Sequence, residues 1–296
     1  MPDYFFAFMS AILWAASAPI INHGLKKIEG DNSVPLILIG LFIAMIIGAM
    51  VLTPFVCYLD SPIEVNPYLI ISGILTFPLA TGAYYLSSRS FSKRAEFTSL
   101  FSKIKPLISF TLAILILKED INQYSVYSAI LVALGITALF IGIKLGELSP
   151  TGVILGILTA LAWSAGEVLM AQGINDIHPM TATWIALLSA ITISSIVIIP
   201  TIYKTPKHRI NVKTLWPFIA HGGISFGAAY SLFFYSVDLI GLGHTVLINA
   251  FWPALAIFFT SLLRFNKGEA VNIPSTLLVS AFFLLVGSLF HAIFIL

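Results

Sequence analysis

The sequence predicts an all-α membrane protein whose ten transmembrane helices form two inverted five-helix repeats. Three observations predict this fold: an apolar composition, apolar stretches long enough to cross a bilayer, and similarity between the two halves of the chain. Of the 296 residues, 58% are hydrophobic and only 9% are charged, and the mean hydropathy is +0.99. A soluble domain needs about a quarter of its residues charged. Lipid must therefore surround most of this chain, and its backbone must be paired within helices or a closed barrel.

The length of the apolar stretches favours helices over a barrel. Barrel strands alternate in segments of about ten residues, whereas a helix needs about twenty apolar residues to cross the hydrocarbon core. The first stretch has no basic segment before it and no cleavage site, so we interpret it as a span and not as a signal peptide. The predicted spans are 4–24, 33–58, 67–88, 97–117, 123–144, 150–173, 179–202, 214–237, 244–263 and 273–295.

The connections between the spans exclude several classes of function. They leave no room for a domain outside the membrane, and the chain has no phosphate-binding loop, which argues against transport driven by ATP. The net charge of +2 indicates no nucleic-acid partner. The single cysteine, Cys57, excludes an internal disulfide, and the histidines lack the spacing of metal ligands. We therefore expect no metal and no cofactor.

The two halves of the chain resemble each other. A shift of 149 residues lays 9–28 on 158–177 and aligns Trp14 with Trp163. Four such matches in the same order, with similar shifts, indicate a duplicated five-helix unit. We predict the halves to be 1–146 and 147–296, together forming one membrane domain. Further aligned pairs are Tyr84 with Tyr230, Pro106 with Pro253, and Gly135 with Gly287.

Because five is an odd number, the second copy must enter the membrane from the opposite side. Inverted repeats of this kind allow two nearly equivalent arrangements, one open to each side of the membrane. The duplication therefore favours a carrier over a receptor or an enzyme.

The distribution of basic residues predicts an orientation. One set of alternate connections holds twelve of the fifteen Lys and Arg residues, the other side holds only Lys118, and Lys103 and Lys105 lie within a span. Positive residues concentrate on the cytoplasmic side. The charges thus place both termini outside.

The whole chain resembles the drug/metabolite transporter superfamily, specifically its EamA-type family. The resemblance implies a multi-pass transporter of small molecules in the bacterial inner membrane, with both termini cytoplasmic, which is the reverse of the charge prediction. The stretch 248–259 is similar to the Asn-x-x-Trp-Pro helix of aromatic amino acid exporters in this family, but the first half has Lys105 where Trp252 stands. The markers of the resemblance are Trp14, Trp163, Pro106, Pro253, Glu119 and Glu269.

Of the thirteen acidic residues, only Glu167 lies near the middle of a predicted span. A charge at that depth costs on the order of 3 kcal/mol unless it is paired, so Glu167 must face the interior of the bundle. Trp163, four residues earlier, shares its helix face. Two interpretations stay open: a neutralised residue that joins helices, and a site for a substrate ammonium group or a coupling proton.

Lys105 occupies the place of Trp252 in the repeat, and we expect it to line the same cavity. Ser102 precedes Lys105 by three residues, as Asn249 precedes Trp252, so both pairs should lie on equivalent inward faces. Lys103, two residues from Lys105, should point to another side and extend toward the headgroups.

Five further residues carry weaker hypotheses. Pro106 and Pro253 break the hydrogen-bond ladder of their helices, either beside the binding site or as packing kinks. Tyr84 and Tyr230 offer a ring face and a hydroxyl group, although a tyrosine in a bundle often only packs. His23 is a second candidate for proton coupling, with a structural histidine as the alternative.

These residues predict a secondary transporter of a small polar or zwitterionic, amino-acid-like metabolite. A multidrug or cation exporter is the first alternative, and a membrane-embedded enzyme is the second, although no nucleophile with a base is present. The expected partners are the substrate and the lipid bilayer; the oligomeric state is left open, and a monomer is compatible with the sequence. The predicted substrate-binding residues are Trp163, Glu167, Lys105, Trp252, Asn249, Tyr84, Tyr230, Ser102 and Trp14.

Overall fold

Helices make up nearly all of the chain in the computed structural model, and no strand occurs in the part that it describes. The described residues are 3–28, 33–59, 62–90, 100–141, 149–175, 177–206, 210–266 and 274–294. The elements are α1 (Phe5–Lys27), α2 (Ser33–Leu59), α3 (Pro67–Ile74), η1 (Leu75–Thr81), α4 (Gly82–Ser90), η3 (Leu100–Ile104), α5 (Lys105–Leu112), η4 (Ala113–Leu117), α6 (Gln123–Ile141), α7 (Pro150–Gly173), α8 (Pro179–Lys204), α9 (Val212–His221), η7 (Gly222–Ala229), α10 (Tyr230–Ile240), α11 (Leu242–Asn249), α12 (Trp252–Asn266) and α13 (Ser275–Phe294).

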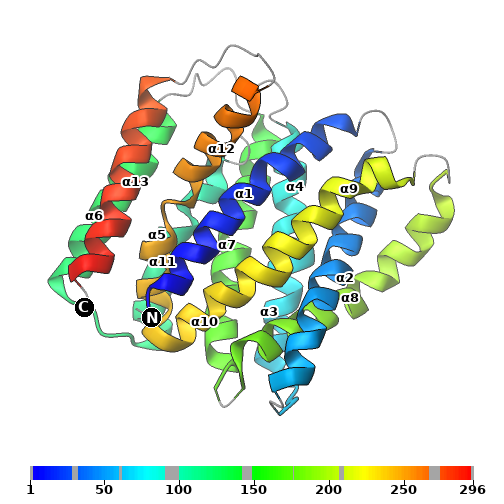
Figure 1. Ribbon diagram of the computed structural model, residues 1–296, viewed down its shortest axis with the longest axis horizontal. Coiled ribbons are helices and arrows are strands. Elements are labelled where there is room, and N and C mark those ends of the chain that lie inside the picture. Colours follow the sequence, from blue (N-terminus) through cyan, green and yellow to red (C-terminus); the bar gives the residue numbers. More distant parts are fainter. Residues whose placement is uncertain are drawn as a thin grey trace.

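The helices give ten transmembrane spans in two inverted five-helix repeats, as the sequence predicted (Figure 1). Among the described residues, nine helical stretches are long and apolar enough to cross a membrane. The remaining span, Leu100–Leu117, changes from a 3₁₀ segment to an α-helix and then to a π-helix. The predicted boundary between the halves, 146/147, lies outside the described residues.

Polar caps and prolines set where several spans begin. The Asn66 side chain accepts a hydrogen bond from the N–H of Leu69 at 3.0 Å, and Ser149 accepts one from Gly152 at 3.3 Å. A proline follows each of these caps, in the first turn, where a missing N–H costs nothing. The Pro-containing breaks between apolar stretches are therefore start signals for helices.

The two halves carry π-helical segments at equivalent positions. η1 begins at Leu75 and η7 begins at Gly222, 147 residues later. π-Helical turns are rare and often occur at functional sites. The apolar pattern of the sequence gave no sign of them, because their residues are as hydrophobic as those of an α-helical span.

Two glycines, one in the third span of each half, let helices of opposite halves meet backbone to backbone. A Cβ atom on Gly73 of α3 would overlap the backbone of Ala186 in α8. A Cβ atom on Gly222 of η7 would overlap the backbone of Ala44 in α2. Small residues at such crossings favour tight helix packing within lipid. The halves are thus interlocked in the same way twice.

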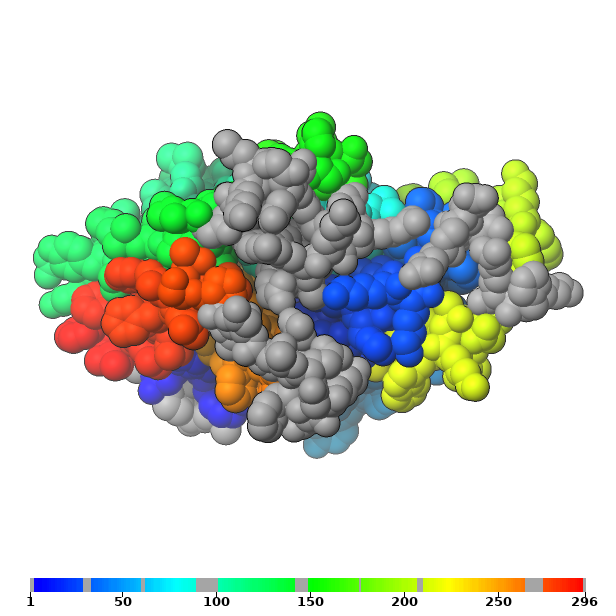
Figure 2. All heavy atoms as spheres, turned by 90° about the horizontal axis from the view of Figure 1, so that it is seen from above, coloured from blue at the N-terminus to red at the C-terminus, as the bar shows by residue number. Residues whose placement is uncertain are grey.

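The pair α6 and α13 lies at one end of the bundle, and α8 and α9 lie at the opposite end (Figures 1 and 2). Ser128 of α6 donates a hydrogen bond to the Gly287 carbonyl of α13 at 2.9 Å. The spans between these two ends surround the middle of the molecule.

Candidate functional site

A pocket lies between the two halves, near the middle of several spans. It holds about 490 Å³ of space between atoms, open solvent at its mouth included. Both halves contribute to its wall, which is mainly aromatic. The lining residues are Trp14, Ser17, Ala18, Ile21, Thr81, Tyr84, Lys105, Trp163, His221, Ser225, Phe226, Tyr230 and Trp252. Six of the nine predicted substrate-binding residues are among them.

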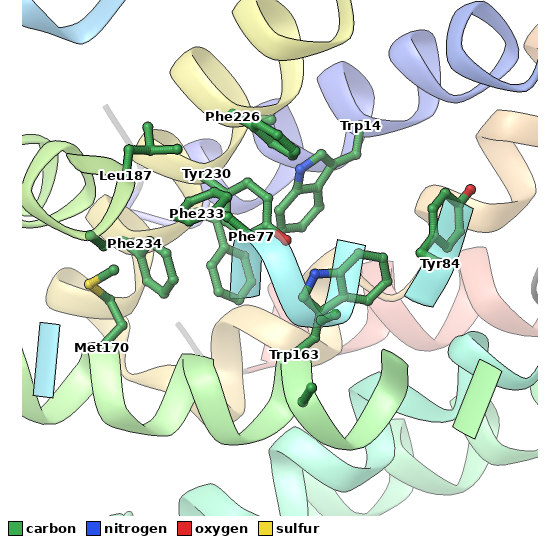
Figure 3. Packing of buried hydrophobic residues seen from close by; sticks show 14 of the residues in the cluster. Trp14, Phe77, Tyr84, Trp163, Met170, Leu187, Phe226, Tyr230, Phe233 and Phe234 are labelled. Carbon is green, nitrogen blue, oxygen red and sulfur yellow. The ribbon is translucent and has the colours of Figure 1, made fainter. Parts of the chain in front are cut away.

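Two tryptophan–tyrosine pairs form the walls of the pocket. The ring centres of Trp14 and Tyr230 lie 4.9 Å apart, and those of Trp163 and Tyr84 lie 5.4 Å apart. Figure 3 shows Trp14 on α1 and Trp163 on α7 facing a common space from opposite helices. The indole N–H of Trp163 donates to the carbonyl of Thr76, which lies in the π-helical segment η1, at 3.2 Å. This bond fixes the orientation of one wall.

Lys105 and Glu167 form an ion pair between α5 and α7. Both residues are buried, Glu167 completely, although only Lys105 lines the pocket. Ser109 donates to the second carboxylate oxygen of Glu167 at 2.7 Å, and Ser164 donates to the Lys105 carbonyl at 3.3 Å. Pairing and hydrogen bonding offset the cost of taking both charges out of water.

The Lys105 ammonium group also lies among aromatic rings. Its Nζ is 4.8 Å from the ring centre of Trp14, 5.1 Å from that of Phe233 and 5.8 Å from that of Trp163. Aromatic faces attract a cation within about 6 Å. Lys105 is therefore held by a carboxylate on one side and by rings of the pocket on the other.

Besides Glu167, three predicted residues do not line the pocket. Asn249 donates to the Ser10 hydroxyl at 2.7 Å and ties α11 to α1. Ser102 is buried, whereas His23 is exposed near the end of α1. Neither Ser102 nor Asn249 is thus among the residues that line the pocket.

The two predicted helix-breaking prolines lie at the starts of helical segments. Pro106 is in the first turn of α5, directly after the 3₁₀ segment η3. Pro253 is the second residue of α12, after a two-residue break that follows Asn249. Glu119, one of the acidic markers of the resemblance, accepts backbone hydrogen bonds from Leu242 and Gly243 and caps α11. Glu269 lies outside the described residues.

Lys103 contacts aromatic rings of the pocket wall. Its Nζ lies 3.5 Å from the ring centre of Trp252 and 6.0 Å from that of Tyr84, and both rings line the pocket. Lys103 and Lys105 thus approach the same aromatic wall although they are two residues apart. The physical reason is that residues 100–104 form a 3₁₀ helix, whose tighter turn changes the directions that an α-helix would give.

His221 is a pocket residue that the sequence argument missed. It lies at the end of α9, is 7% exposed, and its Nδ1 makes no hydrogen bond within the described part of the chain. The rings of Tyr85 and Phe226 lie 5.8 and 5.2 Å from its own. A histidine in the middle of an apolar span was the available signal, because polar residues at that depth mark functional positions.

Comparison with known proteins identifies the fold and the family. The EamA-like transporter family model matches residues 1–141 and 150–293, and so covers both halves of the chain. No curated protein matches the chain. Among solved structures, 28 chains match. One of them, described only as the crystal structure of a protein, has a TM-score of 0.69 and 16% sequence identity, over 97% of this chain and 95% of that chain. At that identity the likeness shows a common fold alone.

Proposed function

The chain belongs to the EamA-like transporter family, and from that premise we propose that it is a secondary transporter of a small polar or zwitterionic, amino-acid-like metabolite. The substrate occupies the pocket between the two halves, and alternating access exposes this pocket to each side in turn. Membership of a transporter family also argues against an enzyme. We place the protein in the bacterial inner membrane, as the family resemblance implies.

The observation that carries the proposal is the buried ion pair of Glu167 with Lys105, the member of the pair that lines the pocket. Lys105 faces the pocket, so a substrate carboxylate can take the place of Glu167 as its partner. Glu167 then needs a new partner, because an unpaired buried carboxylate is costly. A substrate ammonium group or a proton serves as the new partner of Glu167. If the partner is a proton, transport is coupled to proton movement.

The aromatic wall favours a second candidate function, the export of cationic drugs. Rings such as those of Trp14 and Trp163 attract organic cations. Lys105 now occupies that position, so a cationic drug would compete with it. Under this alternative, Lys105→Gln should raise the uptake of a cationic dye, whereas under our proposal it should abolish transport of the metabolite.

The first experiment finds the substrate and tests the pair. Purified protein is screened for ligands that raise its Tm, with amino acids, sugars, nucleotides and drugs as probes. Uptake of the best ligand is then measured in proteoliposomes for wild type, Lys105→Ala and Glu167→Gln, with Lys26→Ala, an exposed residue of α1, as the control. We expect both pocket variants to lose uptake and the control to retain it. Unchanged uptake in both pocket variants would remove the proposal.

A further inference from the structure

A second lysine, Lys103, lies against two aromatic rings that line the pocket, although it is not itself among the lining residues. It lies on η3, and its Nζ is 3.5 Å from the ring centre of Trp252. The Tyr84 ring, 6.0 Å from the same Nζ, packs against Trp163, which in turn lies beside Lys105. These rings therefore lie between the two lysine side chains.

Within the part of the chain that the structure describes, lysines outnumber carboxylates around the aromatic wall of the pocket. Glu167 pairs with Lys105, and within the described residues Lys103 has no carboxylate within ion-pair distance. Its contacts there are the faces of Trp252 and Tyr84. A ring face is a weaker partner for an ammonium group than a carboxylate, whose hydrogen bond carries a full opposite charge. Among the described residues, the surroundings of this wall thus contain two lysines and one carboxylate.

We propose that Lys103 is a substrate-binding residue that selects an amino-acid-like metabolite with a second carboxylate and a net charge of −1. This inference rests on the proposed function, in which Lys105 and Glu167 receive the zwitterionic part of the substrate. The second carboxylate then meets Lys103 in place of the Trp252 ring. A substrate of this class brings one negative charge more than it has positive charges, and so balances the site.

The surroundings explain how Lys103 can exchange partners. Lys103 is only partly buried, and its side chain lies across the face of Trp252 without a hydrogen bond to it. A carboxylate that enters the pocket can draw the ammonium group off the ring at little cost. The freed face of Trp252 then packs against the body of the substrate.

The test compares acids with their amides, which share a shape and differ in charge. Binding of L-glutamate and L-glutamine, and of L-aspartate and L-asparagine, is measured by Tm shift and titration calorimetry on the purified protein. The variants are Lys103→Gln and Lys103→Arg, with Lys26→Gln as a charge-loss control at an exposed position. We expect an acid to bind wild type and Lys103→Arg about tenfold more tightly than its amide, the gain of a hydrogen bond between charged groups. In Lys103→Gln the two should bind within about twofold of each other.

Three outcomes would overturn the inference. They are an amide that binds as tightly as its acid, an acid preference that persists in Lys103→Gln, and the absence of binding by both acids. The proposed function fails by a different result, namely uptake that is insensitive to Lys105→Ala and Glu167→Gln. Loss of binding in those variants together with an unchanged acid preference in Lys103→Gln would refute only the role of Lys103. Equal Tm values of the unliganded variants exclude misfolding as a cause.

Discussion

The pocket allows a direct comparison of the two halves of the chain. The ring of Trp14 lies 4.9 Å from that of Tyr230, and the ring of Trp163 lies 5.4 Å from that of Tyr84. In each pair a tryptophan of one half meets a tyrosine of the other. Trp14 aligns with Trp163 and Tyr84 aligns with Tyr230 in the repeat, so each pair is the counterpart of the other. The two halves therefore contribute equivalent parts of the aromatic wall.

The charged residues do not follow this symmetry. The shift of 149 residues carries Glu167 back onto Ala18, and the shift of 147 carries Lys105 onto Trp252. Ala18 and Trp252 also line the pocket, so the two positions that correspond to the ion pair carry uncharged side chains. Duplication thus supplied the scaffold and the rings twice, whereas the ion pair of Lys105 and Glu167 has no counterpart in the repeat. A pocket of this kind can hold a polar substrate in one orientation.

The largest expected effect comes from replacing Glu167 and Lys105 with the residues that stand at the corresponding positions of the other half, Ala and Trp. Glu167→Ala leaves the Lys105 ammonium group buried without its partner, and Lys105→Trp leaves the carboxylate alone. Each single change should lower the free energy of unfolding by about 3–5 kcal/mol. The double variant removes both charges and should recover much of that stability, while its transport activity stays absent. Thermal unfolding in detergent and uptake in proteoliposomes measure the two effects.

A double variant no more stable than the worse single variant would contradict this prediction. That result would mean that packing around Glu167 and Lys105, and not their charges, dominates stability at this corner.

The next effect tests whether the halves interlock equally. Gly73→Ala and Gly222→Ala each push a methyl group into the backbone of a neighbouring helix, which cannot move aside as a side chain can. Each should cost about 1–3 kcal/mol, and the two losses should be similar. Gly223→Ala is the matched control, since its Cβ would lie 3.8 Å from Ile47 and Val51, at ordinary contact distance. Unfolding midpoints of the three variants decide the point; a loss at only one of Gly73 and Gly222 would show unequal packing.

A smaller difference is expected between the two tryptophans. Trp163 donates to the Thr76 carbonyl, whereas within the described residues Trp14 makes no such hydrogen bond. Trp163→Phe should therefore destabilise the protein by about 1 kcal/mol more than Trp14→Phe. Both changes should weaken substrate binding, because both rings line the pocket. Unfolding curves and binding titrations on the same preparations separate the two effects, and equal stabilities would rule out a role for the hydrogen bond.

The last prediction concerns the side of the membrane on which the ends of α2 and α8 lie, and we expect its variants to be as stable as the wild type. Cys57 is exposed near the end of α2, and Tyr203 is exposed near the end of α8, its counterpart in the second half. Two proteins are treated with a membrane-impermeant maleimide on intact cells: the wild type, which has Cys57, and the double variant Cys57→Ser/Tyr203→Cys. We expect only one of the two proteins to be labelled. Labelling of Cys57 follows from the charge bias, and labelling of position 203 follows from the family resemblance. Equal labelling of both sites would contradict the inverted arrangement.

Local features of the sequence predicted most of the fold. Apolar length identified all ten spans, because a helix that crosses lipid must satisfy its backbone within itself. The span Leu100–Leu117 was found in this way although it is not a regular α-helix. The π-helical segments η1 and η7 were not predicted, since they depend on how neighbouring helices pack against them.

The site could be predicted in part. Glu167 and Lys105 stood out because a charge within a span needs a partner. Their contact, and the hydrogen bond of Trp163 to Thr76, join residues that are far apart in the chain. The contact of Lys103 with the Trp252 ring was not predicted, because it depends on how the 3₁₀ segment η3 lies relative to α12.

The sequence by itself thus determined that this chain is a duplicated bundle of ten helices in lipid, with few charges inside it. Hydropathy and repetition depend only on the order of residues. The tertiary structure alone decided which of those charges meet, which rings enclose them, that His221 lines the pocket, and that Lys103 contacts Trp252. Such contacts depend on the rotation and depth of each helix, and these are set by packing against helices from the other half.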